Sequence, residues 1–435
     1  MFQDDGSSSV TSTPLQIFPT MSPSCQLRTT PYPWLKELKS EERGLCLIHL
    51  LLTCAKHVTS GNFDHANLAL DQISHLASPE GDTMQRIASY FSEALANRIL
   101  KSWPGLYKAL HSTKISIGND SILSRKTFFD RFPYLKLAFV IANQTIIEAM
   151  EGEKMVHVVD LNAVEPTQWR ALLHEFAGRP GGPPHLRITG IHHQKKILDH
   201  MANILTEEAE KLDIPFQFNP IETKIDDLDI EKLKIKTGEA LAISSILQFH
   251  LLLTTDKTTQ KSPPLSKNED SASSCAISST KLDRFLNRLW NLSPKIMVVT
   301  EQESDHNQSD LMERLSESLY FYAALFDCAE STLPRASPER SKVEKMFGEE
   351  IKNIIACDGE ERIERHEKLD KWIRRFTLAG FRPVRLSYYG LVLAQRLLQG
   401  STSCNGCRIK EENGCVVMCW QDRPVFSVSA WMPRR

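Results

Sequence analysis

The sequence predicts an α/β fold in which helices cover both faces of a largely parallel sheet. Short apolar segments alternate with amphipathic helical segments from residue 151 to 435, a pattern typical of strands joined by crossover helices. Residues 38–150, by contrast, show only the apolar spacing of helices. A hydrophobic fraction of 41% and a charged fraction of 24% are ordinary for a chain with a large core. We therefore expect a helical N-terminal part followed by an α/β core.

Helix start signals divide the N-terminal part into segments. Ser40 is expected to cap the first helix, because its side chain can accept a hydrogen bond from a free backbone N–H. Asp64 is expected to open the second helix, and the spacing of Asp82 and Gln85 predicts a capping box at the start of the third. Residues 124–150 are expected to form one further helical stretch.

Short segments rich in β-branched and apolar residues are expected to form the strands of the core. They are residues 155–161, 186–191, 215–219, 240–246 and 295–301. The helices expected beside them are residues 167–176, 195–212, 282–290 and 309–326. Two last strands, 415–420 and 425–431, are expected to close the fold as an antiparallel hairpin around residues 422–424.

Two polar segments are expected to be disordered. Residues 1–37 are rich in Ser, Thr and Pro, and residues 254–280 form a similar insertion between apolar segments of the core. Such sequences bury too little apolar surface to offset the entropy that a chain loses on ordering. The folded domain is therefore expected to span residues 38–435, with one inserted loop.

The composition excludes several classes of function. The 52 basic and 54 acidic residues give a net charge of −2, which argues against binding nucleic acid through a dominant basic surface. The densest apolar run, residues 45–52, is far shorter than the ~20 residues that span a bilayer, so no membrane association is expected. Ten cysteines spread along the chain suit a reducing compartment rather than a disulfide scaffold. We therefore expect a soluble, intracellular protein.

The turn at residues 160–169 is where a nucleotide or S-adenosylmethionine would bind in a sheet of this kind. Glycines are needed at such a turn, because the backbone must approach the ligand closely. The sequence of the turn, DLNAVEPTQW, contains no glycine. We therefore expect a structural corner between a strand and a helix, with no bound cofactor.

Four cysteines close together near residue 410 raise the question of a zinc site. They are Cys404, Cys407, Cys415 and Cys419. The second pair has C-x3-C spacing with no glycine of the kind found in a zinc knuckle. Cys415 and Cys419 fall on one face of an apolar strand, where a free cysteine behaves as a small hydrophobic residue. We therefore expect core packing and no metal.

No other pattern in the sequence predicts catalysis. His192 and His193 follow a strand without a carboxylate or cysteine at ligand spacing, so they are expected to be a polar loop pair. The sequence contains no G-x-S-x-G, H-E-x-x-H or phosphate-loop pattern. No catalytic, cofactor-binding or metal-binding residues are therefore predicted.

Two leucine patterns each have two interpretations. Leu198, Leu205 and Leu212 are seven residues apart, as in a leucine zipper, but their helix is short and has a wide apolar stripe. Packing on the sheet is therefore favoured for this helix. A second pattern fits L-x-x-L-L, the motif of helices that dock in a partner's groove, although core packing is the simpler interpretation. Its leucines are Leu47, Leu50 and Leu51.

Residues 360–368 carry a dense run of both charges, EERIERHEK. The simpler interpretation is a solvated helix face with ion pairs three and four residues apart. The alternative is that its arginines form bidentate pairs that hold this helix against the sheet.

The order of motifs along the chain resembles that of the GRAS family of plant regulatory proteins. Residues 47–100 and 195–212 resemble its two leucine-rich regions, and GGPPHLRITGIHH at 181–193 resembles the segment between them. VHVVD, RIERHE and SAW resemble three further motifs of the family. The motif residues carried over are Val156, His157, Val158, Val159, Asp160, Arg362, Glu364, Arg365, His366, Glu367, Ser429, Ala430 and Trp431.

The resemblance implies a methyltransferase-like, Rossmann-type core with an N-terminal helical cap. It also implies a nuclear transcriptional coregulator, with a cytoplasmic fraction left open, that acts through protein contacts and binds little DNA directly. The implied partners are DELLA proteins, other GRAS proteins and indeterminate-domain zinc-finger transcription factors. The implied processes are the promotion of gibberellin responses and of root ground-tissue development.

Two departures from the family pattern qualify this expectation. The turn after Asp160 lacks the glycine that is common in the family. The sequence also contains no D-E-L-L-A motif, and for this reason the gibberellin-degraded repressor type is not expected. The rival hypothesis is a methyltransferase-like enzyme that binds S-adenosylmethionine or a nucleotide, because a fold does not decide a function.

Overall fold

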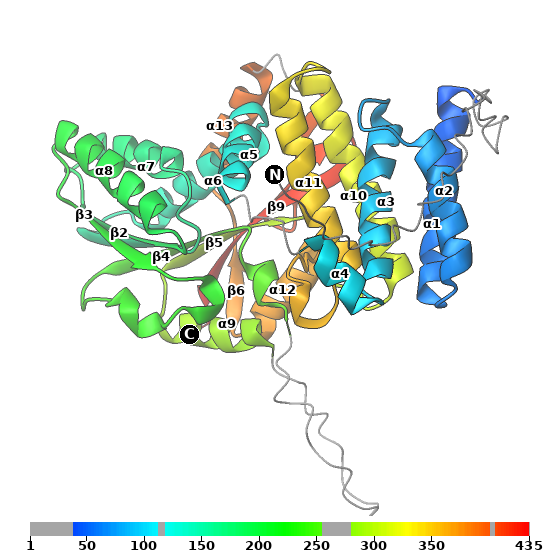
Figure 1. Cartoon of the computed structure of the whole chain (residues 1–435). Coiled ribbons are helices and arrows are strands. Elements are labelled where there is room, and N and C mark those ends of the chain that lie inside the picture. The colour runs from blue at the N-terminus through cyan, green and yellow to red at the C-terminus, as the bar shows by residue number, and fades with distance from the viewer. Residues whose placement is uncertain (1–37, 112–117, 255–279, 401–404, 435) are drawn as a thin grey trace, which may run out of the picture.

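The computed structural model of the 435-residue chain describes residues 38–111, 118–254, 280–400 and 405–434 (Figure 1). The predicted tail, residues 1–37, and residues 255–279 of the predicted insertion lie outside the described residues. None of the helices in the described part is both long and apolar enough to cross a bilayer.

One mixed sheet forms the centre of the molecule, with strand order β3-β2-β1-β4-β5-β9-β8-β7 and β6 paired with β9. The strands from β3 to β5 in this order are parallel, and the remaining pairs are antiparallel. Their bounds are β1 Met155–Asp160, β2 His185–His192, β3 Phe216–Glu222, β4 Ala240–Ile246, β5 Ile296–Gln302, β6 Phe381–Val384, β7 Cys407–Glu412, β8 Cys415–Trp420 and β9 Arg423–Pro433. The predicted α/β class and closing hairpin are confirmed.

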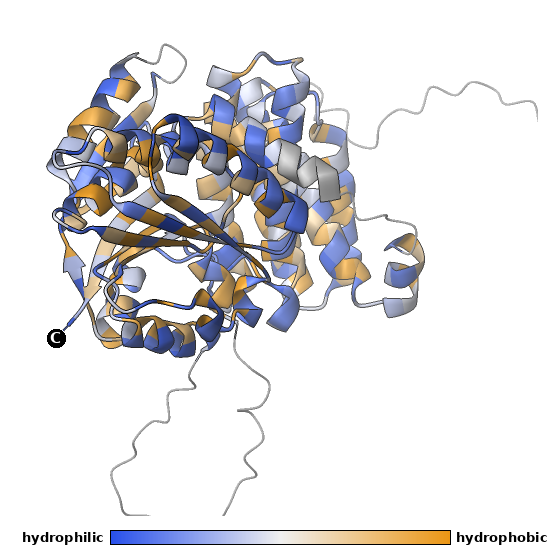
Figure 2. Cartoon of the chain, turned by 90° about the vertical axis from the view of Figure 1, so that its left-hand side faces the viewer, coloured by the Kyte–Doolittle hydropathy of each residue, from blue (hydrophilic) through white to orange (hydrophobic). Residues whose placement is uncertain are grey.

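Helices lie on both faces of the sheet, as predicted (Figure 1). On one side α7 and α8 cover β1 to β3, and on the other side lie α9 and α12. Adjacent residues of β1 face the two layers, since Val158 belongs to the core under α7 and Val159 to the core over α9. Figure 2 shows that the covering helices carry both hydrophobic and hydrophilic residues, as amphipathic helices do.

The helices of the N-terminal part pack beside two helices from the second half of the chain. Helix α3 packs along α11, and α1 packs against α2, α3 and α10. The helix bounds are α1 Ser40–Thr59, α2 Phe63–Leu76, α3 Thr83–Leu100, α4 Pro104–His111, α5 Gly118–Arg131, α6 Tyr134–Ala149, α7 Thr167–Ala177, α8 Lys195–Lys211, α9 Lys281–Asn291, α10 Leu311–Thr332, α11 Pro338–Ala356, α12 Leu369–Leu378 and α13 Tyr388–Gly400.

The predicted helix starts are partly correct. The capping box at Asp82 is present, but Lys39 precedes α1 as its N-cap and the Ser40 hydroxyl instead donates to Asp82 over 2.9 Å. The side chain of Asn62, and not Asp64, caps α2. The single helical stretch predicted over residues 124–150 is wrong, because the chain turns before Pro133 and forms two helices, α5 and α6.

Two strands were not predicted. β6 contains only four residues, one of them a proline, and β7 is mostly polar, with three exposed residues at its end. Neither has the apolar, β-branched pattern from which a buried strand is inferred. Both pair with strands of the closing hairpin, so the tertiary contacts fix them rather than their own sequence.

Candidate functional site: a cavity at the ends of the parallel strands

A cavity of about 930 Å³ lies at the carboxyl ends of the parallel strands. Its floor contains the last residues of four of them, Asp160, His192, Ile246 and Gln302, and residues of α5 and α11 also line it. In open α/β sheets ligands bind at this edge, where the strand order reverses. Here the order reverses between β1 and β4. The sequence did not predict a cavity, because its lining comes from many separate elements.

Asp160 ends β1 and fixes the turn that follows it. One carboxylate oxygen accepts the backbone N–H of Asn162 over 2.9 Å, and the other accepts the indole N–H of Trp169 over 2.7 Å. The Asn162 side chain then donates to the carbonyl of Ile246 at the end of β4. Burial raises the pKa of Asp160 to about 6. Both carboxylate oxygens are therefore bonded within the chain, which supports the predicted structural corner.

His157 lies in the middle of β1 and is fully buried. Its Nε2 pairs with the Thr189 hydroxyl over 2.8 Å, and its Nδ1 accepts from the Arg187 guanidinium over 2.9 Å. Burial and the charge of Arg187 lower the pKa of His157 to about 4, even though the Glu239 carboxylate is 3.4 Å from Nδ1. His157 is thus a neutral link between β1 and β2. The other residues of its motif that precede Asp160 are buried, at Val156, Val158 and Val159.

Residues 362–368 form an extended segment between the 3₁₀ turn Gly359–Glu361 and α12, so the predicted helix face is wrong. Arg362 is buried and donates to the carbonyls of His306 and Gln308. Arg365 donates to the Asn307 side chain over 3.1 Å. Buried carbonyls without helical or strand partners need such donors, which explains why Arg362 is buried.

The acid that ends this motif is also buried. Glu367 accepts two hydrogen bonds from Arg375, of 2.6 and 2.8 Å, and a third from the Asn307 amide. The expected alternative, bidentate pairs made by the arginines of the run, is also wrong, because Arg362 and Arg365 donate to carbonyl and amide oxygens. The bidentate pair that is present comes from Arg375 of α12, and the Asn307 amide adds the link to the loop after β5.

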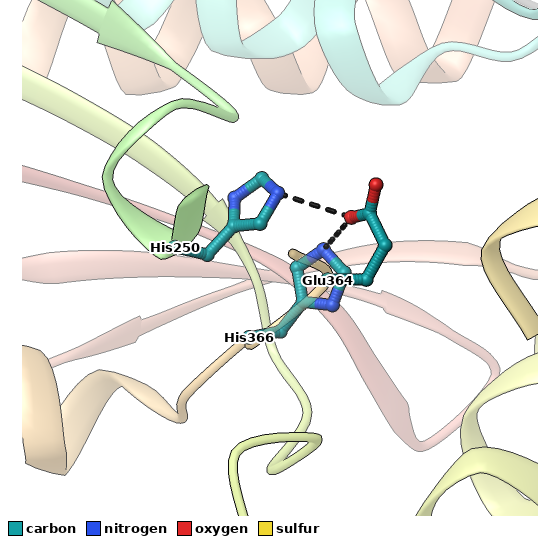
Figure 3. Close-up of side chains that lie close together, drawn as sticks. All are labelled: His250, Glu364 and His366. Carbon is teal, nitrogen blue, oxygen red and sulfur yellow. Dashed lines mark hydrogen bonds and ion pairs between the residues drawn. The ribbon is translucent and has the colours of Figure 1, made fainter. Parts of the chain in front are cut away.

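Three side chains that line the cavity, those of His250, Glu364 and His366, lie close together (Figure 3). The Nε2 atom of His250 is 3.1 Å from the Glu364 Oε2 atom, and the Nε2 atom of His366 is 3.4 Å from the same oxygen. His250 comes from the 3₁₀ turn Phe249–Leu252 after β4, and the other two come from the segment described above. Both histidines are buried and the Glu364 side chain is 15% exposed. In the sequence Glu364 and His366 belong to the charge run and to the RIERHE motif, and no pattern singles out His250.

The C-terminal motif lies away from the cavity. The Trp431 side chain is fully buried, packs 4.8 Å from the ring of Phe376 and donates its indole N–H to the Ser429 hydroxyl over 2.9 Å. Ala430 faces the opposite core layer. These contacts favour a packing role for Trp431.

The leucine patterns also belong to the core. Leu47, Leu50 and Leu51 are buried in α1, so none of them is exposed for docking in a partner's groove. Leu198 and Leu205 are buried where α8 packs on β2 and β3, as the favoured interpretation predicted.

The described cysteines of the four-cysteine group do not lie together at one site. Cys415 and Cys419 share a small cluster with Leu369, whereas Cys407 faces the other core layer. Burial raises the pKa of Cys415 to about 11, so its thiol stays protonated. Cys404 lies outside the described residues.

The loop histidines, His192 and His193, lie against each other at the cavity wall, with ring centroids 4.4 Å apart. Burial, as the largest cause, lowers the pKa of His192 to about 4.

Known proteins resemble the chain over nearly its full length. A model of the GRAS domain family matches residues 47–432. Scarecrow-like protein 3 of Arabidopsis thaliana is 58% identical over 100% of this chain and 99% of its own. GRAS family protein TF80 of Medicago truncatula is 47% identical over 92% of this chain and 98% of its own. DELLA protein RGL1 of Arabidopsis thaliana is 34% identical over 92% of this chain and 72% of its own.

The crystal structure of SCL7 from Oryza sativa has the same fold. It superimposes with a TM-score of 0.74 at 28% sequence identity, covering 88% of this chain and 99% of that one. The family model, the full-length relatives and this structure agree with the order of motifs in the sequence. The chain therefore belongs to the GRAS domain family of plant regulatory proteins.

Proposed function

We propose that the protein is a transcriptional coregulator that acts through contacts with DNA-binding factors and with other GRAS proteins. The observation that carries this proposal is the identity of 58% to Scarecrow-like protein 3 over the whole chain. Its partners would include DELLA proteins, which share 33–34% identity with it, and indeterminate-domain zinc-finger factors. The net charge of −2 is consistent with action through proteins rather than through direct binding to DNA.

This role places the protein in the nucleus, where it would promote gibberellin responses and root ground-tissue development. Similarity to both Scarecrow-like protein 3 and the DELLA proteins supports a link to gibberellin signalling. The absence of a D-E-L-L-A motif from the sequence supports a role as a partner of the repressors rather than as one of them.

A gel-shift experiment tests the proposal with purified full-length proteins. An indeterminate-domain zinc-finger protein should shift its duplex, and addition of this chain should shift the complex further. This chain alone should leave the duplex unshifted at nanomolar concentration, because few phosphate contacts are available to it. Nanomolar, sequence-specific binding by this chain alone, or no supershift and no capture of a DELLA protein, would contradict the proposal.

The cavity favours one second candidate, a methyltransferase-like protein that binds S-adenosylmethionine. A volume of about 930 Å³ at the switch point of the sheet is large enough for a small ligand. The glycine-free turn and the internal bonds of Asp160 weigh against it. A thermal-shift scan discriminates, because a ligand at ~100 times its Kd stabilises the folded state by roughly 2.7 kcal/mol. An unchanged midpoint with S-adenosylmethionine would remove this candidate.

A further inference from the structure

We propose that His250, Glu364 and His366 form a binding site for one divalent transition-metal ion, zinc by the chemistry of its donors, at the wall of the cavity (Figure 3). The two imidazole nitrogens and one carboxylate oxygen all lie within 4.8 Å of one another. This site is independent of the coregulator role, which does not require a metal.

The distances from the carboxylate oxygen to the two imidazole nitrogens fit a tetrahedral ion. Two ligands of zinc, each about 2.0–2.2 Å from the metal, stand roughly 3.3–3.5 Å apart. The Glu364 oxygen lies 3.1 Å from the His250 nitrogen and 3.4 Å from the His366 nitrogen. Two imidazoles and a carboxylate are a donor set typical of zinc with a fourth position for water, whereas magnesium and calcium prefer oxygen ligands.

His366 has a free nitrogen that points into this group. Its Nδ1 atom is 2.9 Å from Nδ1 of His306, whose Nε2 is 2.8 Å from the Ser304 hydroxyl. Two proton arrangements satisfy these contacts, and the one that suits a metal has His366 donating to His306 and His306 donating to Ser304. The Nε2 atom of His366, fully buried and without a hydrogen bond, then presents its lone pair to the site. An unpaired buried nitrogen is costly, and a metal ion would satisfy it.

His250 is oriented by a second carboxylate behind it. Its Nδ1 atom is 2.8 Å from Glu301 Oε2, and the backbone N–H groups of Gln248 and Phe249 hold the other Glu301 oxygen at 3.1 and 2.8 Å. A carboxylate behind a histidine fixes the tautomer that coordinates through Nε2, as in many zinc sites. The Glu301 residue therefore acts as a positioning residue for the proposed ligand.

Carboxylates on both sides of the His250 ring favour a cation at the site. Glu301 lies 2.8 Å from Nδ1 of His250, and Glu364 lies 3.1 Å from Nε2. Two carboxylates beside one imidazole attract positive charge, which a divalent ion would supply. Ions can reach the site, because all three proposed ligands line the cavity.

Metal content and spectroscopy of the full-length protein test the site. The protein is stripped with a chelator, supplied with Zn²⁺ or Co²⁺, dialysed and analysed for metal. We expect one Zn²⁺ per chain and, for Co²⁺, visible bands of a four-coordinate nitrogen and oxygen site without a thiolate charge-transfer band. No bound metal, or a strong thiolate band, would overturn the proposal even before any variant is made.

Matched variants locate the ion. Glu364→Gln keeps the shape of a partly exposed side chain and should weaken Zn²⁺ binding by more than about 100-fold, because a ligand is lost. Glu301→Gln changes only the positioning residue and should weaken binding less, by ~10–100-fold. His193→Gln, which changes a histidine in the same cavity outside the group, should bind as the wild type does. If Glu364→Gln does not fold, His250→Asn takes its place. Full retention of zinc in a folded ligand variant would overturn the assignment.

Discussion

The indole N–H of Trp169 donates to the buried carboxylate of Asp160 over 2.7 Å and joins the first turn of α7 to the end of β1. The bond gives a structural role to Asp160, the last residue of the VHVVD motif, because it ties the end of the strand to the helix that follows. Together with the bonds of Asn162 to Asp160 and Ile246, it holds the corner by side-chain contacts.

Removal of this donor should destabilise the fold. Trp169→Phe leaves one oxygen of a buried carboxylate without its partner, which costs roughly 1–3 kcal/mol, and the lost ring volume adds to that cost. Chemical denaturation measures the change in the free energy of unfolding. Trp290→Phe is the control, because the Trp290 indole also donates a hydrogen bond but its side chain is exposed. Equal losses in the two variants would contradict a special role for the Asp160 contact.

The contribution of His157 to the stability of the protein should be lost as the pH is lowered from about 6.5 towards about 4. Burial and Arg187 hold the pKa of His157 at about 4, below the value of 6.5 expected in the unfolded chain. In that interval the unfolded state binds a proton that the folded state does not, so protonation favours unfolding. Burial acts in the same direction on His192 and His306.

Urea denaturation midpoints between pH 7 and pH 5 measure this effect. His157→Gln should reduce the dependence on pH, although it should also lower stability at pH 7 because its bond to Thr189 is altered. His49→Gln, at an exposed position of α1, is the matched control. An unchanged pH dependence in His157→Gln would show that this imidazole does not titrate as described.

Four of the five parallel strands could be predicted because each is a short apolar run, and β3, at the edge of the sheet, begins with alternating phenylalanines and polar residues. Their order in the sheet could not, since it depends on which crossovers the helices permit. The charge run from residue 360 to 368 was misassigned because charged residues are normally solvated. Arg362 is buried because it donates to two loop carbonyls, and nothing in the local sequence indicates this contact. The segment became part of the core because the loop after β5 supplies its partners.

The cavity was harder to predict than the fold. Its proposed metal ligands come from two segments far apart in the chain, His250 after β4 and Glu364 with His366 before α12. Zinc motifs are recognised in a sequence by ligands at short, fixed spacings, so no such motif could predict these three residues as one site. The one local indication was a histidine in the turn that follows a parallel strand, at the sheet edge where ligands bind.

Deletion of residues 256–279 should leave the fold intact. The segment is polar and rich in Ser and Pro, and the elements on either side of it, the turn Phe249–Leu252 and α9, contact each other. A short linker can therefore close the gap at little entropic cost. Thermal unfolding should retain one cooperative transition within a few degrees of the wild-type midpoint. Loss of that transition would show that the segment contributes to the core.

Trp431→Ala should destabilise the protein strongly and weaken all of its partner interactions together. The ring is fully buried between β9 and α12, against Phe376, and truncation of a buried tryptophan costs ~3–5 kcal/mol. That is a large share of the ~5–15 kcal/mol by which domains are typically stable, so soluble yield should fall as well. Trp103→Ala, at a side chain that is 47% exposed, should melt close to the wild type. Thermal melts, together with capture of the two proposed partners, a DELLA protein and a zinc-finger factor, distinguish a packing role from an interface role. A Trp431→Ala variant that melts like the wild type but loses only one partner would show that Trp431 is an interface residue and not part of the core.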